Sequence, residues 1–465
     1  MALSDAGSFV YHTVDRSPLG VAAARGADLL YAEDQELYQA LHAEQHRQET
    51  SLSLVASSSV CDPSVLACMS SAAMNVTAEG YPGARYHAGC AEIDPIEQLA
   101  VDRARAMFAA RYVNAQPHSA TTANYAVLSA LLAPGDVVLG MRLDQGGHLT
   151  HGYSVAYSGT YFRAVNYGLD AQGAIDYDSV AALAREHRPL MIICGATAYP
   201  RTVDFARFRA VADETGALLM ADISHIGGLV AAGLHPSPID HAHVTTVCTH
   251  KQLAGPRGGL IMAGRDADLD VDGVPLATRL ARAVFPYFQG APILPAIAGK
   301  ARALALADTD EFRATARRIT DGAAAIAAEL VKLGHRVVTG GTDNHIVLLD
   351  LSGTSVSGLV AEHALEEVGI VVNKNRVPGD PRPAAVTSGI RIGSNSAAQR
   401  GLGLTEMRRC ARLIDAVLRG TQPTGERTGR LEPFTAQAVR AEVASLTSQF
   451  PLPRYVPADR WSDGT

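Results

Sequence analysis

The sequence predicts an α/β protein with a largely parallel sheet covered by helices on both faces, followed by a smaller α+β C-terminal domain. From about residue 100 onward, short apolar segments bounded by Gly, Pro or Asp alternate with segments of helical periodicity. Strands that are apolar throughout are typical of a sheet buried on both faces. We expect one strand to run opposite to the others. The predicted strands are 136–141, 189–195, 217–222, 244–248 and 259–264, and the predicted helices between them are 122–132, 178–187 and 203–215.

The pattern changes near residue 305, where a long helical stretch at 311–334 begins. It is followed by a predicted strand at 344–351 and a predicted helix at 356–368, which indicates a separate α+β domain. At the other end, an amphipathic helix is predicted at 34–49 and an arm or loose tail at 1–30, while 420–432 reads as a polar surface loop. The predicted divisions are an N-terminal arm with helices at 1–80, a large domain at 81–308 and a small domain at 309–465.

Composition excludes several classes of protein. Of the 465 residues, 47% are hydrophobic and 19% are charged, which is typical of a large core and not of a disordered chain. The net charge of −7 and the lack of a basic stripe argue against a nucleic-acid partner. No apolar run reaches about 18 residues, and the N-terminus lacks a secretory apolar region, so we expect a cytoplasmic protein without a membrane span. The six scattered cysteines fit free thiols in a reducing compartment.

Lys251 carries the first chemical signal. It lies in THKQLAGPRGG (249–259), directly after the predicted strand 244–248, and open α/β sheets bind ligands at such strand ends. A lysine among neutral groups and near another cation, such as Arg257, has a lowered pKa and can form an imine. Taken alone, Lys251 is also compatible with an ordinary surface lysine in a glycine-rich loop.

Asp222 carries the second signal, because it ends the apolar segment ALLMAD (217–222) at the same edge of the predicted sheet. A carboxylate there could pair with a pyridinium nitrogen and keep it protonated, which makes the ring an electron sink. Ser119, Thr121 and Thr122 precede an apolar helical segment, and a helix N-terminus with hydroxyl groups is a phosphate site. The simpler readings are a turn aspartate and a plain N-cap.

His148 and His151 follow the paired glycines of LDQGGHLTHG (143–152). Their i, i+3 spacing is one that metal ligands can have. The sequence shows no third ligand, so no metal site is predicted.

Together these segments resemble the serine hydroxymethyltransferases in content and order, over roughly residues 33–415. The other segments that carry the resemblance are AEGYPGARYHAGC, AYPRTVDFARFR, ADISHIGGLVAAGLHPSP and TSGIRIG. The resemblance implies a pyridoxal 5'-phosphate (PLP) enzyme of fold type I with a mostly parallel seven-stranded sheet. It also implies tetrahydrofolate as co-substrate, and a homodimer or dimer of dimers with active sites shared between subunits.

The resemblance also assigns roles at the cofactor. Lys251 resembles the Schiff-base lysine, Asp222 the partner of the pyridine nitrogen and His148 the ring-stacking histidine. The phosphate cup is similar at Ser119, Ala120 and Thr121, with Gly290 from the neighbouring subunit. Thr197 and His225 are similar to residues around the phenolic oxygen and the lysine. His250 is also predicted to bind the cofactor, and Thr249 to be catalytic.

Further roles concern the substrates. Arg391 resembles the arginine that binds the amino-acid carboxylate, where a planar guanidinium gives bidentate geometry. Glu79 resembles the acid/base at the hydroxymethyl group, and Tyr86 is predicted to take part in catalysis beside it. The remaining positions similar to substrate or folate contacts are Ser57, Thr77, Tyr86, His87, Leu143, Gly147, Leu149, Phe285 and Asn375.

Several positions depart from the family pattern. Thr77 stands where the family usually has Tyr before AEGYPG, and His87 stands at the second Tyr of RYYGG. Two phenol rings near the substrate Cα are therefore replaced. The other departures are Ser58 and Ser59 in the usual S-E-N, Ala88 in the usual RYYGG, Ala120 in the cup, Asp144 and Gln145 before GGH, Cys248 in the usual T-T-H-K and Ala291 in the usual GGP.

These departures leave several functions open. Loss of the two rings gives space for an additional methyl group on Cα, so the first hypothesis is an α-methylserine hydroxymethyltransferase that forms alanine. The simpler reading is drift within an ordinary serine hydroxymethyltransferase. A folate-independent threonine transaldolase or aldolase shares the bond-breaking step. A non-catalytic protein on this fold would be expected to lack Lys251 or Asp222, and both are present.

Overall fold

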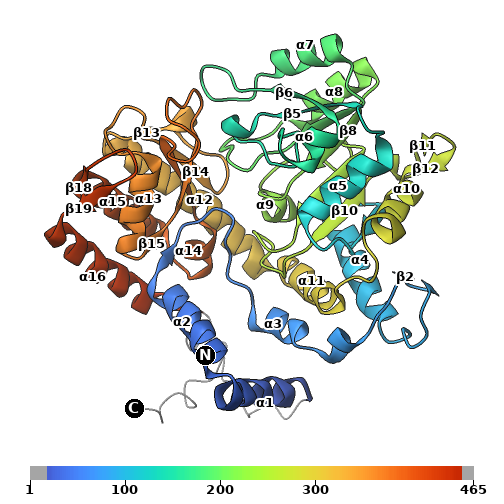
Figure 1. The fold of residues 1–465 in the computed structure, drawn as a ribbon, viewed down its shortest axis with the longest axis horizontal. Helices are drawn as coiled ribbons and strands as arrows, with labels where there is room; N and C mark the ends of the chain where they lie inside the picture. Colours follow the sequence, from blue (N-terminus) through green and yellow to red (C-terminus); the bar gives the residue numbers. More distant parts are fainter. Residues whose placement is uncertain (1–17, 453–465) are drawn as a thin grey trace, which may run out of the picture.

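The computed structural model describes residues 18–452, and its two domains lie side by side (Figure 1). The large domain contains a seven-stranded sheet in the order β4-β10-β9-β8-β7-β5-β6. Its strands are β4 (Tyr112–Asn114), β5 (Val137–Met141), β6 (Arg163–Tyr167), β7 (Met191–Cys194), β8 (Leu218–Asp222), β9 (Val244–Cys248) and β10 (Gly259–Ala263). Neighbours from β6 through β9 pair in parallel, whereas β10 runs antiparallel to both β9 and β4. The single reversed strand that the sequence predicted is therefore β10.

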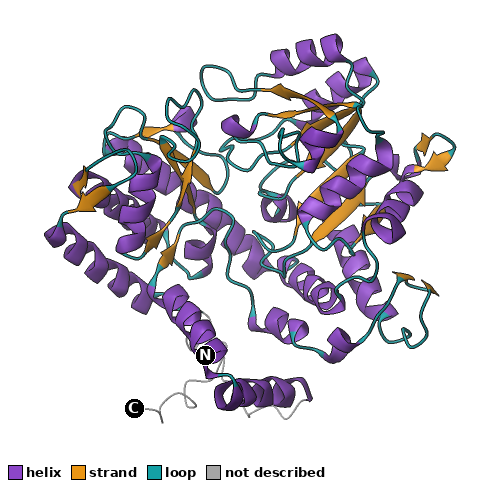
Figure 2. Cartoon of the chain, in the orientation of Figure 1, coloured by secondary structure: helices purple, strands orange, loops and turns teal. Residues whose placement is uncertain are grey.

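Both faces of this sheet are buried, as the apolar strands predicted. Successive residues of one strand belong to different cores: Ile192 lies in one cluster and Ile193 in the other, and the same holds for Leu219 and Met220. Successive side chains of a strand point to opposite faces of the sheet. Since successive residues lie in different hydrophobic clusters, each face of the sheet is covered by other elements. Helices lie on both sides of the sheet (Figure 2); they include α4 (Asp94–Phe108), α5 (Ala120–Leu131), α7 (Tyr177–His187), α8 (Phe205–Thr215) and α11 (Leu294–Ala307).

The five strands predicted in the large domain are all present, with bounds within two residues, but β4 and β6 were not predicted. Both are edge strands of the sheet. β4 has three residues, and β6 reads RAVNY with most of its side chains partly or fully exposed. Neither has the continuous apolar run that marked the central strands, so sequence pattern alone could not reveal them.

The smaller domain is built on a four-stranded antiparallel sheet in the order β13-β14-β17-β16. Its strands are β13 (Arg336–Val337), β14 (Ile346–Asp350), β16 (Asn373–Asn375) and β17 (Gly389–Gly393), and it packs against α12 (Asp310–Lys332), α13 (Gly358–Glu367) and α15 (Leu404–Gly420). The long helix, the strand and the following helix that the sequence predicted are all found. An N-terminal strand, β1 (Leu52–Ser53), pairs in parallel with β15 (Ile370–Val371). Leu52 of this strand and Leu54 just after it join this domain's core.

Two segments have more regular structure than the sequence indicated. Within the expected arm or tail, α1 (Pro18–Glu33) is a helix with no buried side chain, and α2 (Gln35–Thr50) follows as predicted, capped by Asp34. Residues 1–17 of that prediction lie outside the described part. The predicted surface loop at 420–432 contains a short hairpin, β18 (Thr421–Pro423) and β19 (Gly429–Leu431), whose strands are too short for alternation to be seen in the sequence. No helix among the described residues is long and apolar enough to cross a membrane.

Candidate active site

Asp222 and Lys251 lie at the same edge of the large sheet. Asp222 is the last residue of β8, and Lys251 follows the end of the neighbouring parallel strand β9 by three positions. Asp222 pairs in register with Thr246 of β9. The carboxyl ends of parallel strands form the ligand-binding edge of open α/β sheets, and the structure brings the two residues there as the sequence predicted.

Asp222 is buried and held by three hydrogen bonds. Asn124 Nδ2 donates to its Oδ2 at 2.8 Å, His151 Nε2 lies 3.1 Å from the same oxygen, and the Ser224 backbone N–H donates to Oδ1 at 3.0 Å. Burial alone would raise the pKa of Asp222, but the hydrogen bond and positive potential from His151 hold it well below its usual range. The carboxylate is therefore ionised, as required of a partner for a pyridinium nitrogen.

Asn124 is a site residue that the sequence analysis missed. Its Nδ2 also donates to Thr150 Oγ1 at 2.8 Å, and Thr246 Oγ1 donates to its Oδ1 at 2.6 Å. The side chain is completely buried on α5. Buried polar groups in one hydrogen-bond network fix each other's orientation, so Asn124 connects α5, the glycine loop and β9 to Asp222. A polar residue within an apolar helical segment was the available signal.

His148 lies beside this network. Its Nδ1 is 2.7 Å from Thr150 Oγ1, and the Thr150 N–H points at the same nitrogen at 3.2 Å. Burial, with the nearby His151 and Lys251, lowers the pKa of His148 to about 4, so the ring is neutral at neutral pH. A flat, neutral ring here suits stacking on an aromatic cofactor.

Asp222 also supplies the third group that the histidine pair lacked in the sequence. Ligand atoms of His148, His151 and Asp222 all lie within 4.8 Å of one another. His151 Nε2 is already paired with Asp222 by a hydrogen bond. We therefore interpret the cluster as part of a cofactor site and not as a metal centre.

Lys251 is largely buried, with charged groups of both signs nearby. Burial lowers the pKa of its amine, the guanidinium groups of Arg391 and Arg257 act in the same direction, and Cys248 and Asp222 oppose them. Among the described residues, no hydrogen bond or ion pair holds the Lys251 amine. A lysine with a lowered pKa and an unpaired amine is suited to imine formation.

The predicted phosphate cup lies at the start of α5. Ser119 is the N-cap, and its Oγ accepts from the Thr122 N–H at 3.0 Å. Ala120 and Thr121 are the first residues of the helix, so their N–H groups point out of its end. Gly259 passes so close that a Cβ there would lie 2.6 Å from the Ser119 carbonyl oxygen, which explains the glycine.

Arg391 reaches the site from β17 of the small domain. Its Nε donates to Asn373 Oδ1 at 3.0 Å, and its Nη1 donates to the Thr197 carbonyl at 2.6 Å. Burial lowers the pKa of Arg391 to about 10, so the group remains a cation at neutral pH. Thr197 in turn donates from Oγ1 to the Gly147 carbonyl at 2.7 Å. The guanidinium is thus held across the two domains with one nitrogen, Nη2, free of intramolecular hydrogen bonds in the described chain.

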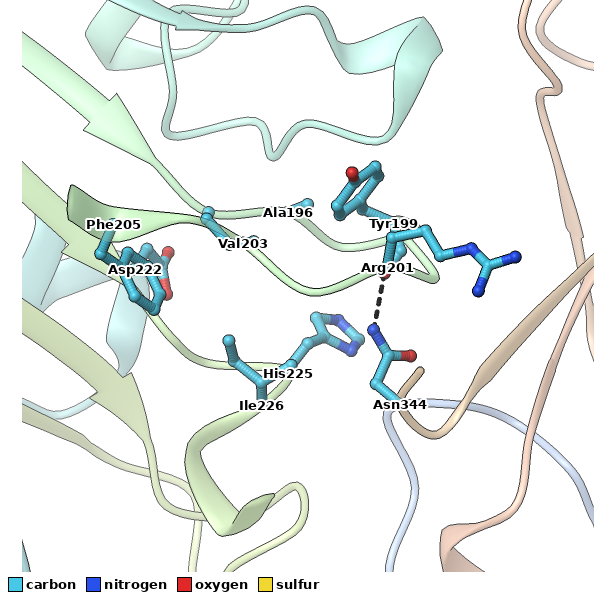
Figure 3. A pocket seen from close by; sticks show the side chains of 10 residues that line it. Ala196, Tyr199, Arg201, Val203, Phe205, Asp222, His225, Ile226 and Asn344 are labelled. Carbon is cyan, nitrogen blue, oxygen red and sulfur yellow. Dashed lines mark hydrogen bonds between the residues drawn. The ribbon is translucent and has the colours of Figure 1, made fainter. Parts of the chain in front are cut away.

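His225 follows β8 and meets a second residue that the sequence analysis missed, His345 of the small domain. The rings are stacked with centroids 5.6 Å apart, and Nδ1 of His225 lies 3.4 Å from Nε2 of His345. Figure 3 shows His225 and Asp222 lining one pocket with Tyr199 and Asn344, whose Nδ2 donates to the Tyr199 carbonyl at 3.0 Å. The pocket therefore lies at the junction of the two domains.

A second group of predicted residues gathers elsewhere. His87 Nε2 lies 3.4 Å from Glu79 Oε2, and a Cβ on Gly290 would lie 3.1 Å from Glu79 Oε1. Tyr86, 76% exposed, packs its ring 5.5 Å from that of Phe285. This group adjoins the hairpin of β2 (Gly80–Tyr81) and β3 (Ala84–Arg85), which lies at the edge of the molecule, beyond α4 and away from the domain junction (Figure 1). The described chain does not bring these residues into contact with Lys251.

The other predicted residues have these positions. Thr249 is buried and donates from Oγ1 to the Pro256 carbonyl at 2.6 Å, so its hydroxyl faces its own loop. Burial lowers the pKa of His250 to about 4. Asn375, on β16, donates to the Arg376 carbonyl at 2.7 Å. Four residues lie in loops or short turns and are at least partly exposed, namely Ser57, Thr77, Leu143 and Leu149.

The residues around Lys251 fit PLP. The ionised carboxylate of Asp222 suits the cofactor's pyridinium nitrogen, and the neutral ring of His148 suits its ring face. The N-terminus of α5, with its hydroxyl cap, suits the phosphate, and the unpaired Lys251 amine suits the aldehyde. The fold and this arrangement define a PLP-dependent enzyme of fold type I.

Comparison with known proteins gives the family. The sequence model of the serine hydroxymethyltransferase family matches residues 30–414. The chain is also 49% identical over 433 residues to "Serine hydroxymethyltransferase 1" of Bordetella parapertussis, covering 93% of this chain and 97% of that protein. The chain belongs to the serine hydroxymethyltransferase family, and is a PLP-dependent hydroxymethyltransferase with tetrahydrofolate as co-substrate.

Proposed function

We propose that this enzyme transfers a hydroxymethyl group between a β-hydroxy amino acid with a methyl group on Cα, α-methylserine, and tetrahydrofolate. The observation that carries the proposal is the pair of replacements around Glu79. Thr77 and His87 stand where the family usually has tyrosines, and His87 contacts the Glu79 carboxylate at 3.4 Å. A threonine in place of a tyrosine frees more than the volume of one methyl group.

The residues around Lys251 are proposed to bind and orient the substrate. Arg391 binds the carboxylate, because its guanidinium is fixed by Asn373 and Thr197 with Nη2 left to donate. PLP bound here would supply an electron sink for the electrons of the Cα–Cβ bond, and the ionised Asp222 would keep its ring nitrogen positively charged. The Lys251 amine would hold the cofactor's aldehyde, and its lowered pKa would let it give way to the substrate amine.

The group around Glu79 is proposed to complete the site of the neighbouring subunit. Glu79, Tyr86 and His87 make no contact with Lys251 in their own chain, and the side chains of Glu79 and His87 are 37% and 46% exposed. A homodimer, alone or as a dimer of dimers, would cover them and place Glu79 at the substrate hydroxyl, where a carboxylate can accept the proton as the hydroxymethyl group leaves. We propose the cytoplasm as its location.

The test is a comparison of α-methylserine and serine as donors, each with and without tetrahydrofolate. We expect formation of alanine from α-methylserine, dependent on tetrahydrofolate, with kcat/KM at least about tenfold above that for serine, since one methyl group is worth roughly 10–200-fold in a fitted pocket. Turnover of serine without turnover of α-methylserine would refute the proposal.

An ordinary serine hydroxymethyltransferase is the second candidate, and the 49% identity to the Bordetella parapertussis protein favours it. The same assay separates the two, because that enzyme would prefer serine. Turnover independent of tetrahydrofolate would instead indicate a transaldolase or aldolase.

A further inference from the structure

Lys300 is a completely buried lysine that the chemistry above does not use. It lies on α11, and the residue is 2% exposed. Its Nζ donates to the carbonyl oxygens of Ala115, Pro117 and Gly259 at 2.7, 3.0 and 3.1 Å. A lysine ammonium has three N–H donors, so this set satisfies all of them.

The three carbonyls belong to two loops of the proposed active site. Ala115 and Pro117 lie between β4 and α5, directly before Ser119 of the phosphate cup. Gly259 begins β10 and ends the loop that starts with Lys251. The Gly259 N–H also donates to the Pro117 carbonyl at 3.0 Å. Lys300 therefore holds the cup loop and the Lys251 loop against each other.

The neighbouring glycine shows how closely Lys300 is packed. A Cβ on Gly258 would lie 2.2 Å from Lys300 Cε and 2.8 Å from its Nζ. A side chain at position 258 would push the lysine out of this place. The absence of a side chain at Gly258 therefore leaves the space that the Lys300 side chain of α11 occupies.

The charge of Lys300 has no counterion within the described chain. It forms no ion pair there, and the one carboxylate that acts on it, Glu97, is already bound by Arg85 at 2.7 Å and by Gln116 at 2.7 Å. Burial lowers the pKa of Lys300 to about 7. A buried cation without an anion is costly, and an anion bound nearby reduces that cost.

We propose that Lys300 is a positioning residue for the phosphate of PLP: it shapes the cup through three backbone carbonyls and gives the site positive charge. The proposal rests on the assignment of Ser119, Ala120 and Thr121 as the cup. Because binding is reciprocal, a phosphate in the cup favours the protonated lysine, and the protonated lysine favours the phosphate.

This linkage predicts a pH dependence specific to the phosphate. Among the described residues, the titratable groups that interact electrostatically with Lys300 are Glu97 of α4 and His118 of the cup loop, and burial lowers the pKa of His118. Arg103 of α4 binds the neighbouring Ala301 carbonyl at 2.7 Å. Without phosphate, burial lowers the pKa of Lys300 to about 7, and bound phosphate shifts the loss of the proton to higher pH. As pH rises through that higher range, Lys300 loses its proton and PLP should dissociate faster. Pyridoxal lacks the phosphate, so its release rate should not show this increase with pH.

The test compares the release of PLP and of pyridoxal from enzyme loaded with each, after dilution into buffer without cofactor. Lys300→Met keeps the approximate volume and removes the three donors. Loss of PLP is expected to accelerate about tenfold or more, which corresponds to about 1.4 kcal/mol. Loss of pyridoxal is expected to change less than about twofold, since its binding does not use the cup. Lys332→Met, at the exposed end of α12, is the matched control and should behave as wild type.

Ser119→Ala separates this inference from the site assignment. If Ser119→Ala leaves the ratio of the PLP and pyridoxal release rates unchanged, the cup assignment fails. If Ser119→Ala changes this ratio of release rates and Lys300→Met does not, the cup assignment stands and only the proposed role of Lys300 is refuted. Should Lys300→Met fail to fold, the wild-type enzyme measured between pH 7 and 9 decides: faster release of PLP but not of pyridoxal supports the proposal, and equal pH dependence overturns it.

Discussion

His87 Nε2 lies 3.4 Å from a carboxylate oxygen of Glu79. The contact places an imidazole against the carboxylate proposed to handle the hydroxyl proton. By the resemblance in sequence, His87 also stands in place of a tyrosine, so under the proposed function an assembled site lacks that phenol ring near Cα. Substrate choice should therefore be sensitive to these positions.

Restoring the two rings should reverse donor preference. In the double variant Thr77→Tyr, His87→Tyr, kcat/KM for α-methylserine should fall about tenfold or more relative to serine, because the added rings occupy the space of the methyl group. The single variant His87→Gln keeps a small polar group and should retain the wild-type preference. An unchanged ratio in the double variant would show that these residues do not select the donor.

Removing the charge of Asp222 should impair catalysis while the cofactor is retained. Asp222→Asn keeps the shape but loses the ionised oxygen, so kcat should fall by roughly 10²-fold or more, as when preorganised electrostatic stabilisation is lost. Steady-state kinetics measure the fall in kcat, and the PLP content of the purified variant shows whether the cofactor is retained. Asp178→Asn, at an exposed ion pair with Arg207, is the control. Near-normal kcat in Asp222→Asn would contradict the assigned role.

His148 should make the protein less stable in acid. Its folded pKa is about 4, below the ordinary value, so between about pH 6.5 and 4 the unfolded chain binds a proton that the folded chain does not. Stability is lost as pH falls through this window, by up to about 3 kcal/mol, since one pKa unit is about 1.4 kcal/mol.

Two substitutions of His148 separate titration from stacking. Both His148→Phe and His148→Gln should reduce the loss of unfolding free energy between pH 6.5 and 4, measured by denaturant titration. Only the flat ring of His148→Phe should retain the cofactor as wild type does. Equal cofactor loss in the two variants would argue against stacking.

Arg391→Lys should weaken binding of the amino acid. A lysine replaces the planar fork by a point charge, so KM for the donor should rise roughly 10- to 100-fold with a smaller change in kcat. Asn373→Ala removes the group that holds Nε and should raise KM less. The exposed Arg313→Lys is the control. A wild-type KM in Arg391→Lys would mean that another group binds the carboxylate.

The central features of the fold could be predicted from sequence because each was local. Apolar strands with breakers at both ends predicted β5, β7, β8, β9 and β10, and placed Asp222 and Lys251 at strand ends. The edge strands β4 and β6 could not be found, since their short or half-exposed segments carry no such pattern.

The site was predictable only in part for a related reason. Asn124, His345 and Lys300 act through contacts with segments distant in sequence, such as the 3.4 Å approach of His345 to His225. No local pattern reports which carbonyl or ring a buried polar residue will meet. A polar residue within an apolar helix was the available sign for Asn124 and Lys300.

The parallel pairing of Leu52 with Ile370 has a consequence for synthesis on the ribosome. The N-terminal strand emerges early, but its partner is made only after the whole large domain. At about 5–20 residues per second, roughly 15 to 60 s separate the two. During that interval the apolar side chains of Leu52 and Leu54 lack their final partners, so the nascent chain is expected to be a client for chaperones until about four fifths of it has been translated.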